Sequence, residues 1–236
     1  MITDERPEDF YRRRIAEEAA TGEPELLLLP TLMKPGGIAA DVGANQGFFS
    51  FALSEIADEV HAFEPHPDYA EFACRMLGTR AAVHSVALSD ARGQASFFVP
   101  VSEDGLELHL AGNLKNAHAQ FQKQKVIEVR VETLDFYELR DVRFIKVDVE
   151  GSEFEVLLGG RETIVRDRPV LLLELLSGTY DRPLEIVEKV CATFPYRAYV
   201  TNNGELLDAA EAIKELDSNT TWGSHIATRN VLFISK

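Results

Sequence analysis

Short apolar runs rich in branched side chains alternate with helical patterns along this chain. Alternation of this kind is typical of βαβ units that build a parallel sheet. We predict seven strands, at residues 38–42, 60–64, 82–88, 144–149, 170–175, 197–201 and 231–234. The pattern therefore predicts an α/β fold.

One helical face is clear between the second and third predicted strands. Its apolar residues recur every three or four positions, which places them along one side of a helix. They are Tyr69, Phe72, Ala73, Met76 and Leu77, and Gly78 follows them as the expected helix end. We expect this face to pack on the sheet.

The stretch from residue 95 to 131 interrupts the alternation. Residues 95–99 and 126–131 have strand patterns, whereas 105–124 are polar. Long polar loops in compact domains are commonly functional, so we expect an insertion at about residues 100–125 that covers the substrate. Residues 1–35 are predicted to form a helical segment on the acceptor side, followed by one domain at 36–236.

Composition narrows the class of protein. Hydrophobic residues make up 45% and charged residues 27% of the 236 positions, which is ordinary for a soluble globular protein. The two cysteines, Cys74 and Cys191, lack any paired ligand spacing, which excludes a zinc ribbon and a disulfide framework. We expect a reducing, cytoplasmic setting.

No apolar run approaches the ~18 residues of a membrane span, and the charged residues 1–20 do not resemble a secretion signal.

The charge balance argues against nucleic acid as a partner. Acidic residues number 39 against 24 basic ones, for a net charge of −15. Proteins that bind nucleic acid neutralise phosphates with Lys and Arg. The longest basic run, Arg12 to Arg14, is followed by Glu17 and Glu18 and is interpreted as a solvated helix face. We expect a small-molecule partner.

The loop after the first predicted strand carries the first candidate chemistry. In open parallel sheets, ligands bind at the carboxyl ends of the strands. There the sequence reads DVGANQG at residues 41–47, which is neither the dinucleotide fingerprint nor a P-loop. Glu64 ends the second predicted strand, and its carboxylate can accept two hydrogen bonds from a ribose diol, as in NAD enzymes. These residues alone leave the cofactor undecided.

Five ordered motifs decide the cofactor by resemblance. They are DVGANQGFFS (41–50), HAFEP (61–65), VALSD (86–90), ETLD (132–135) and FIKVDVEGSE (144–153), and NVLFI (230–234) is similar to a last strand. Together they resemble the FkbM-type family of S-adenosylmethionine-dependent methyltransferases. The resemblance implies a class I methyltransferase fold, with a Rossmann-like sheet of seven strands, an antiparallel last strand and helices on both faces. It also implies methyl transfer from S-adenosylmethionine to a hydroxyl of a small-molecule or sugar-containing metabolite.

The resemblance also implies roles for individual residues. We expect Glu64 to hold the ribose and Asp148 to lie near the sulfonium. The methionine part would contact Asp41, Gly43, Ala44, Asn45 and Gly47, and the adenine would lie beside Pro65, Ala87, Ser89 and Asp90. Each of these residues also has a purely structural alternative. Gly43 and Gly47 can simply form a turn, Glu64 can stabilise the start of a helix, and Ser89 and Asp90 can form a turn.

The candidate catalytic residues lie at the end of the fourth predicted strand. Lys146, Asp148 and Glu150 alternate, so they are expected on one side of that strand. Asp148, Glu150 or a histidine is the candidate base that removes the acceptor proton. The alternative is that Lys146 and Glu150 form an ion pair that holds the strand end.

Other polar residues leave alternatives open. His61 and His84 fall in predicted strands and are expected to be structural, whereas His109, His118 and His225 are unranked candidates for the acceptor pocket. Asp148, Glu150 and Glu174 can also gather around a divalent cation, although no spacing requires one and no metal is expected. Phe48, Phe49 and Phe51 are expected in the core, and Trp222 as a loop anchor or a substrate contact.

Two rival functions share the same sheet. An NAD-dependent oxidoreductase would also use Glu64, but the third glycine of its loop is missing. A non-catalytic protein that binds the cofactor is the other alternative. The identity of the acceptor is not predicted, because the segments expected to surround it, 1–35 and 100–125, lie outside the resemblance. A homodimer formed through the N-terminal helix is left open.

Overall fold

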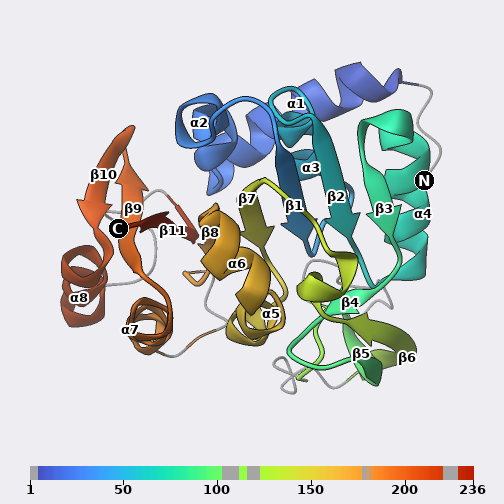
Figure 1. The fold of residues 1–236 in the computed structure, drawn as a ribbon. Coiled ribbons are helices and arrows are strands. Elements are labelled where there is room, and N and C mark those ends of the chain that lie inside the picture. The colour runs from blue at the N-terminus through green and yellow to red at the C-terminus, as the bar shows by residue number, and fades with distance from the viewer. Residues whose placement is uncertain (1–4, 103–111, 116–122, 177–179, 181, 220–227) are drawn as a thin grey trace.

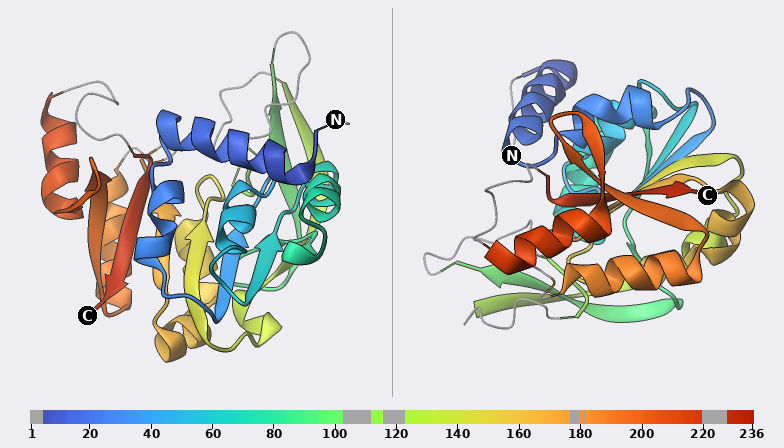
Figure 2. Two further views of the ribbon diagram at one scale, coloured as in Figure 1. Left: turned by 90° about the horizontal axis from the view of Figure 1, so that it is seen from above. Right: turned by 90° about the vertical axis from the view of Figure 1, so that its left-hand side faces the viewer.

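The structure is a computed structural model that describes residues 5–102, 112–115, 123–176, 180, 182–219 and 228–236, without the side chains of 215–219. An eight-stranded sheet forms its centre, and helices cover both faces (Figure 1). A three-stranded sheet lies beyond the carboxyl ends of β1 (Ile38–Val42) and β2 (Glu59–Phe63), separate from the large sheet (Figure 2). The α/β class predicted from the sequence is confirmed.

The large sheet has the strand order β10-β9-β11-β8-β7-β1-β2-β3. Its strands are β1 (Ile38–Val42), β2 (Glu59–Phe63), β3 (Ala82–His84), β7 (Val142–Val147), β8 (Val170–Glu174), β9 (Tyr196–Asn202), β10 (Glu205–Asp208) and β11 (Asn230–Ser235). The strands β8, β7, β1, β2 and β3 pair in parallel, whereas β11 is antiparallel to both β8 and β9. The expected antiparallel insertion of the last strand is therefore confirmed.

The helices divide between the two faces of the sheet. One face carries α1 (Pro7–Thr21), α2 (Glu25–Leu32), α3 (Phe48–Leu53) and α4 (Pro67–Leu77), and the other carries α5 (Glu153–Gly159), α6 (Arg161–Asp167), α7 (Pro183–Thr193) and α8 (Ala209–Asn219). Short 3₁₀ turns, η1 (Gly78–Arg80) and η3 (Leu134–Tyr137), follow α4 and the strand β6 (Lys123–Glu132). The helix predicted to end at Gly78 does end there.

The large sheet has one hydrophobic core on each of its two faces. Successive side chains of a strand point to opposite faces, so Phe144 packs with α1–α4 while Ile145 packs with α5–α8. Leu171 and Leu172 divide in the same way. Burial on both faces explains why the central strands have continuous apolar sequences rather than alternating ones.

The single strand predicted at 82–88 is wrong. The chain forms β3 in the large sheet and then β4 (Ala87–Leu88), which pairs with β6 in the small sheet. The small sheet is completed by β5 (Gly93–Val101) and β6 (Lys123–Glu132), which are antiparallel to each other. It has its own core of Ala87, Phe97, Val99, Val129 and Val131. An apolar run alone does not show that a strand changes sheets.

The strand β10 is absent from the sequence prediction, so the large sheet has eight strands rather than seven. Asn203 and Gly204 connect β9 to β10 with φ values of 51° and 82°. Positive φ at both central residues is the signature of a type I′ hairpin turn, for which Asn-Gly is the preferred sequence. The dipeptide is therefore the available signal for this hairpin.

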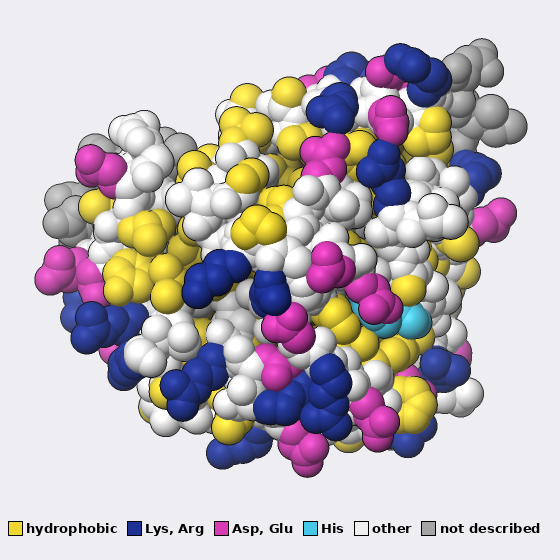
Figure 3. Space-filling model, turned by 45° about the horizontal axis from the view of Figure 1, so that its top comes forward, with side chains coloured by type: hydrophobic (Ala, Val, Ile, Leu, Met, Phe, Trp, Pro, Cys, Tyr) yellow, Lys and Arg dark blue, Asp and Glu magenta, His cyan; other side chains and the backbone are white. Residues whose placement is uncertain are grey.

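The N-terminal segment is helical over most of the described part of residues 1–35, and its helices contribute Phe10, Tyr11, Leu26 and Leu29 to the core. Its expected role as a cover of the acceptor stays a prediction. On the face in Figure 3, Lys and Arg alternate with Asp and Glu without forming a continuous basic patch. Within the described residues, no helix has the length and apolar character needed to cross a membrane.

Candidate functional site

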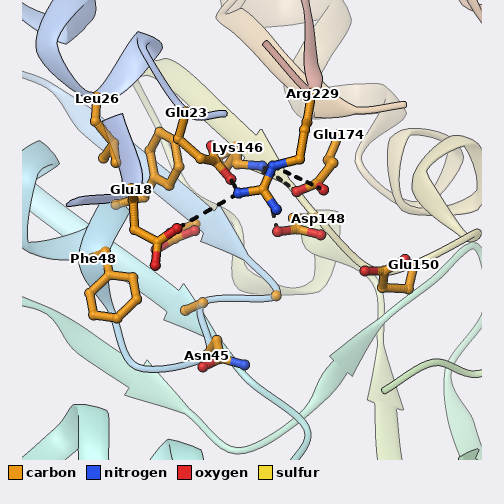
Figure 4. Close-up of a pocket in the computed structure, with 14 residues that line it drawn as sticks. Glu18, Glu23, Leu26, Asn45, Phe48, Lys146, Asp148, Glu150, Glu174 and Arg229 are labelled. Atoms are coloured by element: carbon orange, nitrogen blue, oxygen red, sulfur yellow. Dashed lines mark hydrogen bonds and ion pairs between the residues drawn. The ribbon is translucent and has the colours of Figure 1, made fainter. Parts of the chain in front are cut away.

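Two adjoining pockets open along the carboxyl ends of the central strands. The acidic pocket, of about 650 Å³, is lined by Glu18, Glu23, Leu26, Asp41, Gly43, Ala44, Asn45, Phe48, Phe49, Lys146, Asp148, Glu150, Glu174 and Arg229 (Figure 4). The Glu64 pocket, of about 600 Å³, is lined by Val42, Gly43, Asn45, Phe63, Glu64, Pro65, Val86, Ala87, Leu88, Phe97, Gly112, Leu114, Asp148, Val149 and Glu150. Because Gly43, Asn45, Asp148 and Glu150 line both, the two form one continuous site.

The glycine loop is held against two neighbouring strands. The amides of Gly43 and Ala44 donate to the carbonyl of Phe63 at 2.9 and 3.0 Å. Gly43 has a φ of 81°, and a β-carbon there would come within 1.7 Å of the Asp148 carbonyl oxygen. Only glycine therefore allows the loop after β1 to approach the loop after β7 this closely.

Glu64 lies buried at the end of β2. Its carboxylate accepts hydrogen bonds from the amides of Asn45, at 2.8 Å, and His66, at 2.7 Å. Burial raises the pKa of Glu64 to about 7, although these two amides oppose the shift. A carboxylate has about four lone-pair positions, so each oxygen retains the capacity to accept another hydrogen bond.

Asp41 is buried in β1 beneath the glycine loop. It accepts a hydrogen bond from the Ser50 hydroxyl at 2.6 Å. Burial raises the pKa of Asp41 to about 6. Asp41 belongs to the lining of the acidic pocket, whereas Glu64 belongs to that of the Glu64 pocket.

Lys146 is the central cation of the acidic pocket, and its side chain is only 1% exposed. Its Nζ donates to Asn230 Oδ1 at 3.0 Å and lies 3.7 Å from Asp148 and 3.9 Å from Glu174. Burial disfavours the charged amine, but Asp148, Glu23 and Glu174 together raise the pKa of Lys146. Burial and the neighbouring Asp148 raise the pKa of Glu174, which favours its protonated form. The alternative interpretation, an ion pair between Lys146 and Glu150, is wrong, because among the described residues the ion-pair partners of Lys146 are Asp148 and Glu174.

The turn between α1 and α2 and the start of β11 close the acidic pocket. Asn230 Nδ2 donates to Glu23 at 2.9 Å and to Glu25 at 3.1 Å. Arg229 Nη2 donates to Glu23 at 3.3 Å. Sequence patterns do not single out Glu18, Glu23 or Arg229, because they lie far apart in the chain and belong to no motif.

The loop after β7 carries Asp148 and Glu150. β7 ends at Val147, and Glu150 has a φ of 54°, so the predicted strand alternation of Lys146, Asp148 and Glu150 is wrong. The buried carboxylate of Glu153 accepts from the amides of Val149, at 3.1 Å, and Gly151, at 3.2 and 3.3 Å. Glu150 reaches the site from this loop and lies apart from the Lys146 cluster in Figure 4.

The remaining predicted cofactor residues divide by position. Pro65 and Ala87 line the Glu64 pocket, and Ala44 lines the acidic pocket. Gly47 packs instead beside Leu77 and the Tyr11 hydroxyl. Ser89 and Asp90 lie outside the lining of both pockets, and the Ser89 carbonyl packs against Gly159. Their adenine contacts stay predictions without support from these pocket walls.

Histidines and aromatics fall into three groups. His61 and His84 lie side by side in β2 and β3, with Nδ1 of His61 3.0 Å from Nε2 of His84, as expected of a structural pair. Phe49 and Phe51 are buried as expected, whereas Phe48 and Phe49 also line the acidic pocket. The candidates His109, His118, His225 and Trp222 lie outside the described residues.

A carboxylate group with metal-ligand spacing occurs in the acidic pocket. Oxygens of Glu23, Asp148 and Glu174 lie within 4.8 Å of one another. The group suggested by the sequence has Glu150 in place of Glu23. Because Lys146 and Arg229 already lie among these carboxylates, the donor set does not require a divalent cation.

Comparison with known proteins agrees with this architecture. Residues 41–201 match the family model of the methyltransferase FkbM domain. The 2-O-methyltransferase NoeI of Sinorhizobium fredii (strain NBRC 101917 / NGR234) is 29% identical over 157 residues, which covers 60% of this chain and 64% of NoeI. The crystal structure of methyltransferase FkbM from Methylobacillus flagellatus KT superposes with a TM-score of 0.57 and 16% identity, over 92% of this chain and 49% of that one.

The structural likeness shows a shared fold. This chain spans 64% of the length of NoeI and about half of the crystallised protein. The matched residues 41–201 include the glycine loop, Glu64, Asp148 and Glu174, and they make up more than half of the chain. The chain therefore belongs to the methyltransferase FkbM domain family.

Proposed function

We propose that this protein transfers a methyl group from S-adenosylmethionine to a hydroxyl of a small-molecule or sugar-containing metabolite. One observation carries the proposal: two pockets of different chemistry meet at Asp148, with a ribose-type carboxylate on one side and a charged cluster on the other. Family membership supports the reaction class. NoeI, described as a 2-O-methyltransferase, supports oxygen as the acceptor atom.

The Glu64 pocket suits the adenosine half of the cofactor. Its walls include Val42, Val86, Leu88, Phe97 and Leu114, which offer apolar surface to an aromatic base. Glu64 lies among them with unused lone pairs, which the two hydroxyls of a ribose can fill. The apolar walls and the hydrogen-bond acceptors of Glu64 therefore fit adenosine.

The acidic pocket suits the methionine half and the acceptor. S-adenosylmethionine, when bound, supplies an electrophilic methyl group on a positively charged sulfur. Asp148 lines both pockets and its side chain is 30% exposed, so it can reach a ligand at their junction. The buried Nζ of Lys146 forms an ion pair with the Asp148 carboxylate at 3.7 Å. We assign Asp148 as the group that orients the acceptor hydroxyl and accepts its proton, with Glu150 as the next candidate.

Glu174 has a different role from Asp148 in this assignment. Burial and Asp148 raise the pKa of Glu174 and favour its protonated form, so we assign Glu174 as a hydrogen-bond donor rather than as the base. The acceptor hydroxyl would donate a hydrogen bond to Asp148 and accept one from Glu174. These two hydrogen bonds would hold the acceptor oxygen in line with the methyl group, which is the main requirement of a displacement reaction.

Formation of S-adenosylhomocysteine tests the function directly. The purified protein is mixed with S-adenosylmethionine and hydroxylated compounds, and S-adenosylhomocysteine and methylated product are measured by mass spectrometry. We expect both to form in equal amounts. Cofactor binding without product from any hydroxylated compound would instead support a non-catalytic protein, and binding of NAD with NADH formation would support an oxidoreductase.

A further inference from the structure

Arg229 lies at the mouth of the acidic pocket, immediately before β11 and outside the region that matches the family. Its guanidinium lies between Glu18 and Glu174 and close to Asp148 (Figure 4). Nη2 is 3.3 Å from Glu23 and 3.7 Å from Glu18, and Nε is 3.9 Å from Glu174. The arginine is thus held over the pocket mainly by charge.

The hydrogen-bonding capacity of this guanidinium is largely unused. Arginine has five N–H donors, yet among the described residues only Glu23 lies at hydrogen-bonding distance from it. The contacts at 3.7 and 3.9 Å are too long for hydrogen bonds. Nε is buried and has no hydrogen-bond partner within the described part of the chain. Nε itself is enclosed, but the side chain as a whole is 36% exposed, so the remaining N–H groups of the guanidinium can donate to a ligand oxygen in the pocket.

Strand order separates Arg229 from the cofactor pocket. From Glu64 at the end of β2, the sheet continues through β1, β7 and β8 before it reaches β11. Neighbouring strands are about 4.8 Å apart, so Arg229 lies several strand spacings beyond the ribose position. Asp148, after β7, lies between them. A cofactor placed from Glu64 to Asp148 leaves Arg229 for the acceptor.

The surrounding charges select the kind of oxygen. Glu18, Glu23 and Asp148 lie around Arg229, so a phosphate or carboxylate bound there would be repelled by neighbouring acidic side chains. A hydroxyl is compatible with both kinds of neighbour, because it accepts from a guanidinium and donates to a carboxylate at once. Two neighbouring hydroxyls match the planar fork of arginine. Phe48 and Leu26 add apolar surface for the carbon skeleton.

We propose that Arg229, held in place by Glu23, binds the acceptor and selects an uncharged compound with two neighbouring hydroxyls, such as a neutral sugar ring. This inference rests on the proposed function, because it places the cofactor in the neighbouring pocket. Arg229 is then a specificity-determining residue, whereas Asp148 performs the proton transfer.

Turnover with matched acceptors tests the proposal. Methyl glycosides of neutral hexoses and deoxyhexoses are compared with the phosphate esters of the same sugars, and release of S-adenosylhomocysteine is measured. We expect turnover with neutral glycosides and none with their phosphates. Turnover confined to the phosphates, or absent from every neutral glycoside while phenols or amines are methylated, would overturn the proposal. Failure of the wild-type protein to bind S-adenosylhomocysteine would contradict the proposed function instead.

Substitutions of Arg229 test whether its side chain is responsible for binding the acceptor. Arg229→Gln should lower kcat/KM at least about thirtyfold, and Arg229→Lys about tenfold because it retains charge but loses the fork. Both should bind S-adenosylhomocysteine within about threefold of wild type, which also shows that they fold. Arg197→Gln is the control, because Arg197 is exposed on β9 away from both pockets.

Wild-type kcat/KM in Arg229→Gln would overturn the proposal. So would loss of S-adenosylhomocysteine binding with unchanged binding of 5′-methylthioadenosine, since Arg229 would then hold the amino-acid end of the cofactor.

Discussion

The carbonyl oxygen of Asp148 lies so close to Gly43 that a β-carbon on residue 43 would come within 1.7 Å of it. This contact brings the loop after β1 against the loop after β7, and both loops line the two pockets. The glycine is therefore required by the site as well as by the turn.

Gly43→Ala should reduce the free energy of unfolding by more than backbone strain alone. Gly204 is a matched control, because its φ of 82° is almost equal to the 81° of Gly43, while a β-carbon on Gly204 would meet nothing within 4 Å. Left-handed backbone costs an alanine roughly 1–2 kcal/mol, so Gly204→Ala should lose about that much. We expect Gly43→Ala to lose at least about 2 kcal/mol more, from overpacking. Equal losses in urea unfolding would contradict the close contact.

Lys146→Met should be strongly destabilising. It leaves the carboxylate of Asp148 without its buried cation, and breaking a buried ion pair in this way costs up to about 3–5 kcal/mol, less here because the Asp148 side chain is 30% exposed. Adding Glu174→Gln should change the loss only slightly, because burial and Asp148 favour the protonated form of Glu174. Adding Asp148→Asn should recover part of it, because Asp148 is the carboxylate that the substitution leaves unpaired at 3.7 Å from the former cation. Urea unfolding at pH 7 measures all three, and a loss below about 1 kcal/mol for Lys146→Met would contradict this account.

Cofactor binding should depend on pH through Glu64. Its pKa of about 7 in the free protein means that the ionised form, which accepts hydrogen bonds best, increases as pH rises from 6 to 8. The Kd for S-adenosylhomocysteine should therefore fall by up to about tenfold across this range. Glu64→Gln should bind at least about tenfold more weakly at pH 8 and show no such trend. A flat wild-type profile would remove Glu64 from the ribose site.

Asp148→Asn separates proton transfer from cofactor binding. The substitution retains size but removes the charge, so we expect kcat to fall by about a hundredfold or more while the Kd for S-adenosylhomocysteine stays within about threefold. Glu150→Gln, in the same loop, is the comparison and should lower kcat much less. Weaker cofactor binding with normal kcat at saturation would assign Asp148 to holding the cofactor.

Local sequence pattern predicts much of the fold and one half of the site. Strand β1, the Gly43 loop and Glu64 follow one another in the chain, so a motif identifies them together. The antiparallel β11 is predicted by resemblance. Asn203-Gly204 is a readable hairpin signal, and it would have added β10 to the predicted strands.

The other half of the site depends on tertiary contacts between distant segments. Glu23 and Asn230 are joined by a buried hydrogen bond although 207 positions separate them. Hydrophobic periodicity carries no information on such a contact, because neither residue belongs to an apolar face. The same reason applies to Arg229, whose neighbours come from α1, the α1–α2 turn and β8.

Calorimetric titration of the protein with S-adenosylhomocysteine, beside a titration with NAD, tests the central claim most directly. The two joined pockets predict saturable binding of S-adenosylhomocysteine with one site per chain, weakened at least about tenfold by Glu64→Ala, and no heat of binding with NAD. Saturable binding of NAD without any response to S-adenosylhomocysteine would contradict the account.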